Sequence, residues 1–300
     1  MIEFLLHQKI TFVRYPKPEN AVFSILIPSW NNYEHLKLLV ESIQKNSHHQ
    51  HQICVHLNEE TDNRSRDFLE QKGISYSIST ENTGVCFGFN AAFALAECPY
   101  LVFIDDDMYV APDWDKPLLE EINKQNSIYW AISGSMIERE DKGNSCAIYP
   151  YNYGSHPENF EEERFLKEAN TLPHRDWSGS LWYPLVLHRD VWQLVGGLSV
   201  EFSPGMYSDP DFMMKLWQIG IRDFKGISGS RVYHFMSKST KRVKRNDGRT
   251  QFFKKWNMSS STFLKFYLGL GEDYSGPRLM PQGSAFQKAV LKDKFKKIFT

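Results

Sequence analysis

Three consecutive carboxylates, Asp105 to Asp107, follow a short apolar run at Tyr100–Ile104. Such a run is typical of a strand buried on both faces of a sheet, and the carboxyl end of that strand is where open α/β sheets bind ligands. Adjacent carboxylates repel one another, and a hard cation such as Mg²⁺ or Mn²⁺ would relieve the repulsion. We therefore predict a divalent cation at this strand end. Capping of a following helix, or exposure to water, is the alternative.

A second acidic pair, Asp209 and Asp211, lies at the start of a helix predicted over Pro210–Ile219. Asp209 could cap this helix, because a carboxylate there accepts hydrogen bonds from free backbone N–H groups. It could instead take a proton from an attacking hydroxyl group, as a general base does. The sequence alone leaves both roles open.

His234 lies in a strand-like stretch, Arg231–Phe235, and a basic segment follows it. The six cations of that segment are Lys238, Lys241, Arg242, Lys244, Arg245 and Arg249. An imidazole could ligate a metal ion and the cations could bind phosphate. A lone histidine is more often structural, however, and a basic run is more often a solvated surface. We predict that the loop Met236–Arg249 closes over a bound diphosphate, since its cations repel one another until an anion arrives.

The elements that would position these side chains alternate between strand and helix over the first ~110 residues. Short apolar runs predict strands at Val22–Pro28, Gln52–Leu57, Ser75–Ser79 and Tyr100–Ile104. Helical spacing of apolar residues predicts helices through Leu36–Ile43, Arg64–Gln71 and Phe87–Glu97. Further strands are expected at Ala131–Glu138 and Ser180–His188. The alternation predicts an α/β fold, with a single domain in which helices flank a mostly parallel central sheet.

The composition excludes several classes of protein. The 300 residues are 41% apolar, 14% aromatic and 24% charged, which is typical of a globular chain and not of a disordered or fibrous one. The formal net charge is -1, so no overall positive field would draw the chain onto nucleic acid. The four cysteines form no C-x-x-C pair, and no run approaches about 18 apolar residues. These features predict a cytoplasmic protein, at most peripheral at a membrane, without a disulfide framework.

Five motifs occur in the order found in a known enzyme family. They are F-S-I-L-I-P-S-W-N at Phe23–Asn31, E-N-T-G at Glu81–Gly84, F-I-D-D-D at Phe103–Asp107, G-G-L-S-V-E-F at Gly196–Phe202 with S-D-P-D-F at Ser208–Phe212, and V-Y-H-F at Val232–Phe235. On these motifs the chain resembles, over Phe23–Phe253, the family 2 glycosyltransferases of GT-A fold. These enzymes use a nucleotide-diphosphate sugar as donor and invert the configuration of the transferred sugar. The resemblance implies a carbohydrate, lipid-linked or protein acceptor and a role in cell-surface polysaccharide or glycoconjugate synthesis.

The resemblance also implies a role for each matched residue. Asp105, Asp107 and His234 would bind Mn²⁺ or Mg²⁺. Asp105 and Asp106 would hold the ribose and the metal-bound waters, and Asp209 would be the catalytic base. The remaining residues of the nucleotide site would be Pro28, Ser29, Trp30, Asn58, Asn82 and Gly84.

Two departures from the family pattern bear on these roles. Many members have V-V-D-N-G-S-x-D where this chain has C-V-H-L-N-E-E-T-D at Cys54–Asp62, so Leu57 replaces the aspartate that contacts the base. Asn58 could substitute, since an amide offers a donor and an acceptor to a pyrimidine. Uridine, thymidine and guanosine donors stay open. Ser208 stands where the family has a glutamate, which leaves Asp209 as the better-matched base.

Two other functions fit parts of the pattern. A sugar nucleotidyltransferase would also join a parallel sheet to a metal and a nucleotide, but the loop at Pro28–Asn32 lacks the glycines and the cation that cradle a triphosphate. An inactive carbohydrate- or nucleotide-binding protein could stack its aromatic side chains on sugars. Such a protein would not need Asp105, Asp107, Asp209 and His234.

We predict an N-terminal extension (1–20), a glycosyltransferase domain (21–256) and a helical tail (257–300). The domain would comprise a nucleotide-binding half (21–110) and an acceptor half with the lid loop (111–256). In the tail, apolar residues are expected near one helical face, namely Phe286, Val290, Leu291, Phe295, Ile298 and Phe299. Lysines would cover the remainder, namely Lys288, Lys292, Lys294, Lys296 and Lys297. This amphipathic helix could lie on an anionic membrane or pack against the domain.

Overall fold

Ten strands form one sheet in the computed structural model, which describes residues 9–59, 61–237 and 246–297. The strands are β1 Ile10–Val13, β2 Phe23–Ser29, β3 Gln52–Asn58, β4 Ser75–Ser79, β5 Tyr100–Phe103, β6 Met108–Val110, β7 Trp130–Ile137, β8 Trp177–Ser178, β9 Leu185–His188 and β10 Asp223–His234. Their order across the sheet is β1-β4-β3-β2-β5-β9-β7-β10-β6, with β8 beside β10.

The sheet is mixed, so the expectation of a mostly parallel sheet is corrected. Strands β2, β3, β4, β5, β7 and β10 run in one direction, while β1, β6, β8 and β9 run in the other. Antiparallel β9 lies between β5 and β7 and reverses the direction twice. A short apolar strand has the same side-chain pattern in either direction, so its sequence does not reveal this reversal.

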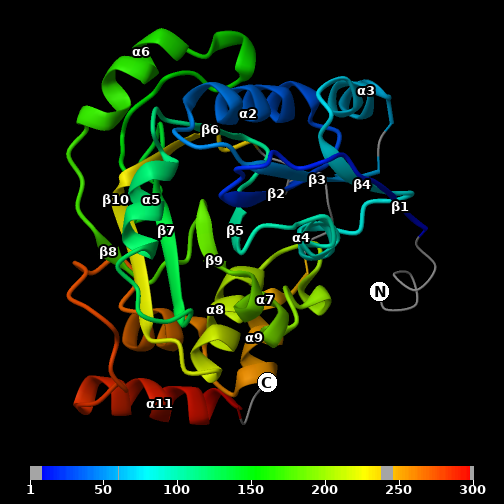
Figure 1. The fold of residues 1–300 in the computed structure, drawn as a ribbon. Helices are drawn as coiled ribbons and strands as arrows, with labels where there is room; N and C mark the ends of the chain where they lie inside the picture. The colour runs from blue at the N-terminus through cyan, green and yellow to red at the C-terminus, as the bar shows by residue number, and fades with distance from the viewer. Residues whose placement is uncertain (1–8, 60, 238–245, 298–300) are drawn as a thin grey trace.

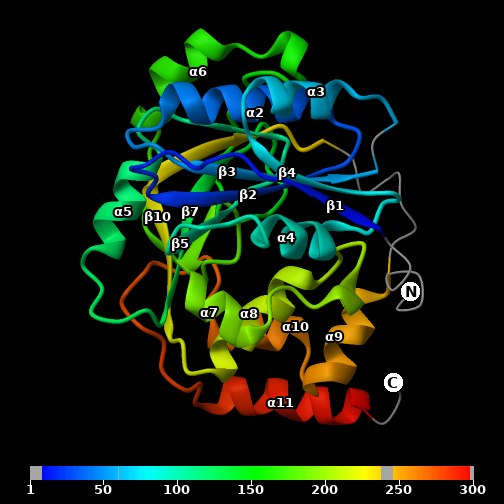
Figure 2. The ribbon, with the colours of Figure 1, turned by 45° about the vertical axis from the view of Figure 1, so that its right-hand side comes forward.

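Helices cover both faces of the sheet (Figures 1 and 2). They are α2 Tyr33–Asn46, α3 Arg64–Gln71, α4 Val85–Phe93, α5 Asp115–Ile122, α6 Glu162–Glu168, α7 Arg189–Val195, α8 Ser208–Gln218, α9 Gly248–Trp256, the short α10 Ser260–Thr262 and α11 Ser284–Lys297. In both views α2, α3 and α6 lie above the sheet, α4, α7, α8 and α9 lie below it, and α11 forms the bottom edge. The predicted single α/β domain with a C-terminal helix is confirmed.

Most predicted elements are present, with shifts at their ends. Helix α3 and strand β4 match the predicted bounds, whereas α4 ends at Phe93 and not at Glu97. Strand β9 begins at Leu185 instead of Ser180, because Ser180 has a φ of 41°, which is not strand backbone. The carboxylates after β5 lead into β6 and not into a helix, which excludes the helix-capping alternative for Asp105 to Asp107.

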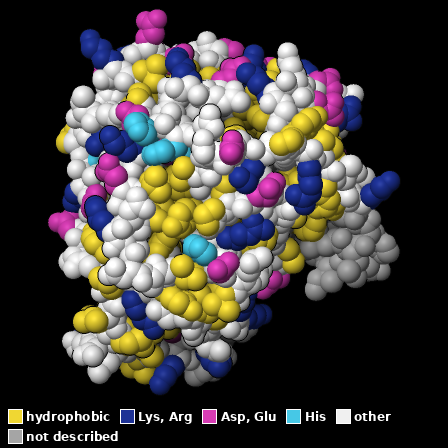
Figure 3. Space-filling model, in the orientation of Figure 1, with side chains coloured by type: hydrophobic (Ala, Val, Ile, Leu, Met, Phe, Trp, Pro, Cys, Tyr) yellow, Lys and Arg dark blue, Asp and Glu magenta, His cyan; other side chains and the backbone are white. Residues whose placement is uncertain are grey.

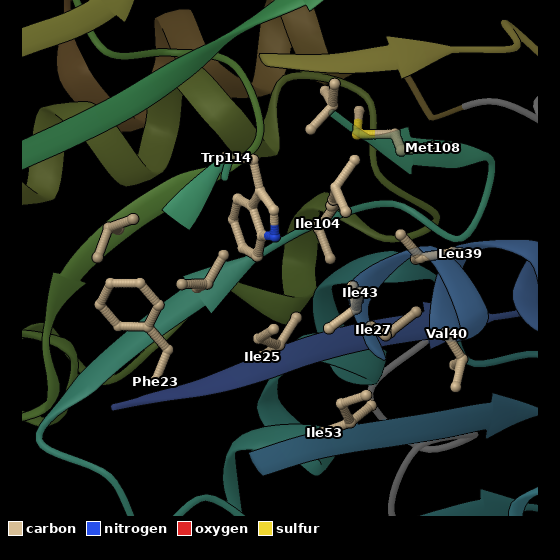
Figure 4. Close-up of a cluster of buried hydrophobic side chains, with 14 of the residues drawn as sticks. Phe23, Ile25, Ile27, Leu39, Val40, Ile43, Ile53, Ile104, Met108 and Trp114 are labelled. Atoms are coloured by element: carbon tan, nitrogen blue, oxygen red, sulfur yellow. The ribbon is translucent and has the colours of Figure 1, made fainter. Parts of the chain in front are cut away.

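The core lies on both faces of β2, because neighbouring side chains of a strand point in opposite directions. On the upper face, Ile25 and Ile27 pack in one cluster with Leu39 and Ile43 of α2 (Figure 4). On the lower face, Leu26 belongs to a second cluster that includes side chains of α4, α7 and α8. Packing on both faces explains why every residue of Phe23–Ser29 is buried.

Asp115, the first residue of α5, anchors the turn after α2. Its buried carboxylate accepts hydrogen bonds from the backbone N–H groups of His48 and His49, both at 2.8 Å. The imidazole Nε2 of His51 lies 3.1 Å from the same carboxylate. Burial alone would raise the pKa of Asp115, but these hydrogen bonds outweigh burial and lower it.

Asp115→Asn is expected to lower the free energy of unfolding by about 3 kcal/mol. The amide NH2 group of asparagine would face N–H donors that the carboxylate oxygen now accepts from. The lowered pKa implies that this stabilisation is present above the unfolded-state pKa and is lost as the pH falls. Urea unfolding at several pH values would measure both effects. The matched control is Asp113→Asn, since Asp113 is exposed and is expected to change stability by no more than about 0.5 kcal/mol. Equal free energies of unfolding for the two variants would contradict the role of Asp115 in anchoring the turn after α2.

Candidate active site

Polar residues gather where the parallel strands end. Six strands share one direction, so their carboxyl ends meet at one edge of the sheet. The polar residues at or just after these ends are Ser29 of β2, Asn58 of β3, Asp105 to Asp107 after β5, Glu138 after β7 and His234 of β10. The fold therefore brings residues from five distant parts of the chain to one edge.

A cavity of about 400 Å³ lies at this edge. It is lined by Asp105, Met108, Met136, Glu138, Lys142, Gly143, Asn144, Leu181, Trp182, Tyr183, Asp209 and His234. Three residues predicted from the sequence, Asp105, Asp209 and His234, thus share one cavity. Another cavity, of about 430 Å³, lies where β3 and β4 begin, and its lining contains none of the predicted site residues.

His234 is held between two acidic side chains. Its Nδ1 lies 3.0 Å from Oε1 of Glu138, and its Nε2 lies 3.7 Å from Oδ2 of Asp107. Burial alone would lower the pKa of His234, but Asp107, Glu138 and Asp105 outweigh it and raise the pKa to about 9. Burial and the neighbouring Asp107 raise the pKa of Asp105 well above its usual range. Both shifts reflect the close spacing of acidic side chains around this cavity.

Glu138 is a residue of this site that sequence reasoning missed. It is buried, and its second oxygen, Oε2, has no hydrogen-bond partner among the described residues. The signal was available, because Glu138 ends the predicted strand Ala131–Glu138 in the way that Asp105 follows an apolar strand. By holding Nδ1, Glu138 leaves Nε2 of His234 directed at Asp107.

Glu138→Gln is expected to lower the pKa of His234, because glutamine still contacts Nδ1 but carries no charge to stabilise the imidazolium. An NMR titration of the histidine rings would measure the shift. Glu140→Gln is the matched control, since Glu140 is exposed and pairs with Lys142 and Arg139 instead. An unchanged His234 pKa in Glu138→Gln would show that this carboxylate does not govern the imidazole.

The two aspartates at the start of α8 have separate surroundings. Tyr207, and not Asp209, occupies the N-cap position of α8, so the expected N-cap role of Asp209 is not observed. Oδ1 of Asp209 accepts a hydrogen bond of 3.2 Å from the hydroxyl of Tyr183. Burial raises the pKa of Asp209 to about 6 in spite of that bond. A carboxylate with such a pKa is mostly ionised at neutral pH and is a stronger base than an exposed aspartate.

Asp211 faces away from this cavity and fastens α9. Its buried carboxylate accepts a hydrogen bond of 2.7 Å from Nε1 of Trp256, and Nζ of Lys255 lies 2.9 Å away. Residues two apart on a helix point about 200° apart around its axis. Asp209 can therefore face the cavity while Asp211 serves the packing of α8 on α9.

The predicted nucleotide side is built from the ends of β2 and β3. Ser29 Oγ donates a hydrogen bond of 2.6 Å to Oδ2 of Asp106, and Nε1 of Trp30 donates one of 3.2 Å to Glu59. Asn58 is buried, and its Oδ1 accepts from the backbone N–H and the hydroxyl of Thr83 at 3.1 and 2.7 Å. Its carbonyl oxygen thus already holds the loop before α4. A contact of Asn58 with the nucleobase stays a prediction.

Two glycines allow elements around the predicted nucleotide-binding residues to pack closely against one another. Gly84 has a φ of 85°, and its N–H donates to Asn82 Oδ1 at 2.9 Å. A Cβ at Gly84 would lie 2.8 Å from Cα of Pro204, and a Cβ at Gly88 of α4 would lie 2.8 Å from Cβ of Pro28. The loop 82–84 therefore packs against the segment before α8, and α4 packs against the end of β2.

Most of the predicted lid loop lies outside the described residues, including Lys238, Lys241, Arg242, Lys244 and Arg245. Its closure over a diphosphate stays a prediction. The described end of the loop belongs to α9, whose first turn is capped by Asp247, which accepts a 3.2 Å hydrogen bond from Thr250 N–H. No helix among the described residues is long and apolar enough to cross a membrane.

Comparisons with known proteins agree with this arrangement. Residues 24–181, more than half of the chain, match the family model described as glycosyl transferase family 2. Among solved structures, S. aureus TarS 1–349 in complex with UDP is similar, with a TM-score of 0.50 and 16% identity over 71% of this chain and 60% of that one. The structure of S. aureus TarS has the same three values and is covered over 36% of its length. At this identity the likeness concerns the fold alone.

The chain spans less than two thirds of the length of these TarS structures, and no curated protein matches it. The family match covers the first two of the five motifs and F-I-D-D-D, while Asp209 and His234 lie beyond it. The family match over more than half of the chain identifies it as a member of glycosyl transferase family 2.

Proposed function

We propose that the chain transfers a sugar from a nucleoside-diphosphate donor to an acceptor hydroxyl group, with metal assistance and inversion at the anomeric carbon. The observation that carries the proposal is the shared cavity of Asp105, Asp209 and His234 at the carboxyl ends of the strands. Family membership and the UDP in a TarS structure of similar fold support a nucleotide-sugar donor.

The proposal places a divalent ion beside this cavity, as a partner of the donor. Among the residues that the structure describes, no group of three or more His, Cys, Asp or Glu side chains is arranged to hold a metal ion. Mg²⁺, however, commonly binds through one or two carboxylates together with substrate phosphates and water. Asp107 and His234 would supply the protein ligands for Mg²⁺ or Mn²⁺, beside Asp105 and the unpartnered oxygen of Glu138. When bound, the ion supplies a Lewis acid that stabilises the leaving diphosphate.

Asp209 carries the proton transfer in this proposal. Its carboxylate accepts the proton of the acceptor hydroxyl, whose oxygen forms a bond to the anomeric carbon. The bond between that carbon and the diphosphate oxygen breaks on the opposite side, which inverts the configuration. The hydroxyl of Tyr183 fixes the Asp209 carboxylate. Lys142, Asn144 and Trp182 also line the cavity and would meet the acceptor.

The proposal also includes a cellular location for the protein. All four cysteines are buried and free, which supports a reducing compartment such as the cytoplasm. A role in cell-surface polysaccharide or glycoconjugate synthesis rests on family membership alone.

Incubation with a panel of nucleotide sugars, with Mn²⁺ or with a chelator, tests the proposal. We expect metal-dependent release of nucleoside diphosphate from one donor, and a β-linked product from an α-linked donor by NMR of its anomeric proton. Release of pyrophosphate would favour a nucleotidyltransferase. Nucleotide binding without any turnover would favour an inactive binding protein.

A further inference from the structure

Helix α11 docks on the domain through one narrow face. The ring of Phe286 lies 5.6 Å from that of Phe266 and 5.7 Å from that of Tyr267, measured between centroids. Farther along the helix, Asp293 is buried and accepts a 3.0 Å hydrogen bond from the N–H of Ser259. Nζ of Lys296 also lies 5.3 Å from the ring centroid of Phe253 in α9, which belongs to the predicted domain (21–256). These contacts confirm that the helix packs inward, one of the two alternatives drawn from the sequence.

The apolar residues of α11 do not share one face, which corrects the sequence-based expectation. At about 100° per residue, Leu291 and Phe295 lie about 140° and 180° around the helix from Phe286. Their exposed fractions are 53% and 59%, whereas Phe286 and Val290 are partly buried. The expected residues Ile298 and Phe299 lie outside the described part of the chain. The outward face is thus itself apolar at its centre.

The segment before the helix adds two more exposed apolar side chains. Leu279 is 85% exposed and Met280 is 56% exposed. Among the described residues, seven large hydrophobic side chains are exposed, and four of them fall within 279–295. More than half of the exposed large hydrophobic side chains therefore come from this one segment, which favours it as an interaction surface, since isolated ones are ordinary on a protein.

The charge of this outward surface has a single sign. All five lysines of α11 are exposed, but only Lys288 and Lys292, about 200° and 240° around the helix from Phe286, lie beside Leu291 and Phe295. Lys294 lies at the flank, at about 80°. Lys296 packs over the ring of Phe253, and Lys297 lies on the inward side, at about 20°. The one acidic residue of α11, Asp293, is turned inward and bonded to Ser259. Hydrophobic and basic side chains adjoin along the bottom edge of the molecule in Figure 3, where Figure 1 places α11.

We propose that the outward surface of residues 279–297 binds an anionic lipid membrane, with α11 lying parallel to the bilayer. Leu291 and Phe295 would enter the interface between headgroups and acyl chains, while Lys288, Lys292 and Lys294 contact anionic headgroups. Inward packing and membrane binding are compatible, because they use opposite sides of the helix. This inference does not depend on the proposed reaction, since it concerns residues outside the active-site cavity.

Co-sedimentation of the full chain with vesicles tests the proposal. We expect binding to vesicles of phosphatidylcholine and phosphatidylglycerol at low salt, and weak binding to phosphatidylcholine alone. High salt should release the protein, because surface charges are screened. Point variants are preferable to truncation, since removal of α11 would uncover Phe266 and Tyr267.

Two sets of variants separate the contribution of charge to membrane binding from that of the apolar side chains. K288Q/K292Q/K294Q should weaken binding to acidic vesicles about a hundredfold, at about fivefold per lysine near the surface. K9Q/K72Q/K116Q is the matched control, since it removes the same charge from exposed lysines elsewhere and should bind nearly as the parent does. L291S/F295S should also weaken binding, whereas F12S, which changes a 44% exposed phenylalanine on β1, should not.

Equal binding by both lysine variants would overturn the proposal, because net charge and not this surface would then govern the attraction. A chain that ignores acidic vesicles and forms a dimer that L291S/F295S dissociates would also overturn it. In that case a second copy of the chain would cover the surface. Hydrolysis of a soluble donor sugar should be unchanged in all of these variants, so the result is independent of the proposed reaction.

Discussion

Asp209→Asn is expected to lower kcat at least about a hundredfold, the usual contribution of a general base, while donor affinity changes little. Asparagine has almost the same shape and can still accept the hydrogen bond from Tyr183, but it cannot take the proton of the acceptor hydroxyl. Initial rates over a range of acceptor concentrations, with calorimetric binding of the nucleotide, would separate the two effects. Turnover within a few fold of the parent would assign the base to another residue.

The pH profile gives an independent reading of the same carboxylate. Protonated Asp209 cannot act as a base, so kcat of the parent should rise with pH through an acid limb near pH 6, the pKa of Asp209. The asparagine variant should lack that limb. Tyr183→Phe is the matched control. Since the Tyr183 hydrogen bond lowers the pKa of Asp209, its loss should move the limb to higher pH with a smaller fall in maximal rate. An acid limb retained in Asp209→Asn would contradict the assignment.

Asp107→Ala is expected to reduce turnover at least about a hundredfold and to abolish the dependence of nucleotide binding on Mn²⁺. The fold should survive, because the change relieves the repulsion between Asp107 and Asp105, which offsets the lost contacts with His234 and Ser237. Calorimetry of nucleotide binding with and without Mn²⁺, together with thermal unfolding, would test both statements. Near-normal turnover of this variant with chelator present would refute the metal assignment.

Asp107→Asn separates charge from hydrogen bonding at this position. Oδ2 of Asp107 accepts a 2.7 Å hydrogen bond from the N–H of Ser237, and an asparagine oxygen can accept it equally. An equal loss in the asparagine and alanine variants would attribute the effect to the negative charge. Full activity of the asparagine variant would attribute it to the contact with Ser237.

The first half of the fold could be predicted because its elements have clear periods. Helix Arg64–Gln71 and strand Ser75–Ser79 appear with the predicted bounds, since apolar spacing and Gly73 mark their ends. The direction of β9 could not be predicted, because it depends on which neighbours the strand pairs with and not on its own four residues. The position of Leu291 on α11 follows from helical geometry, and the expectation of one apolar face on this helix is wrong.

The candidate site likewise contains residues that could be predicted from the sequence and contacts that could not. Asp105 and His234 could be chosen because each lies at the end of an apolar strand, and Glu138 has the same signal. The partners of Asn58 and Asp211 could not be predicted, since they come from residues far along the chain, Thr83 and Lys255. Sequence spacing reveals local periods, but only the folded chain reveals which polar groups are already satisfied.

The close approach of α4 to the sheet has a consequence for mutational scanning. A methyl group at Gly88 would meet Pro28 and the amide of Asn58 at 2.8 and 3.0 Å, and Gly84 is confined by its backbone angle and by Pro204. In a library of single substitutions selected for activity, both glycines would therefore score as badly as Asp209 although neither offers a reactive group. Abundance of each variant, measured alongside activity, would distinguish them. Glycine variants should be depleted from the folded pool, whereas Asp209→Asn should be abundant and inactive.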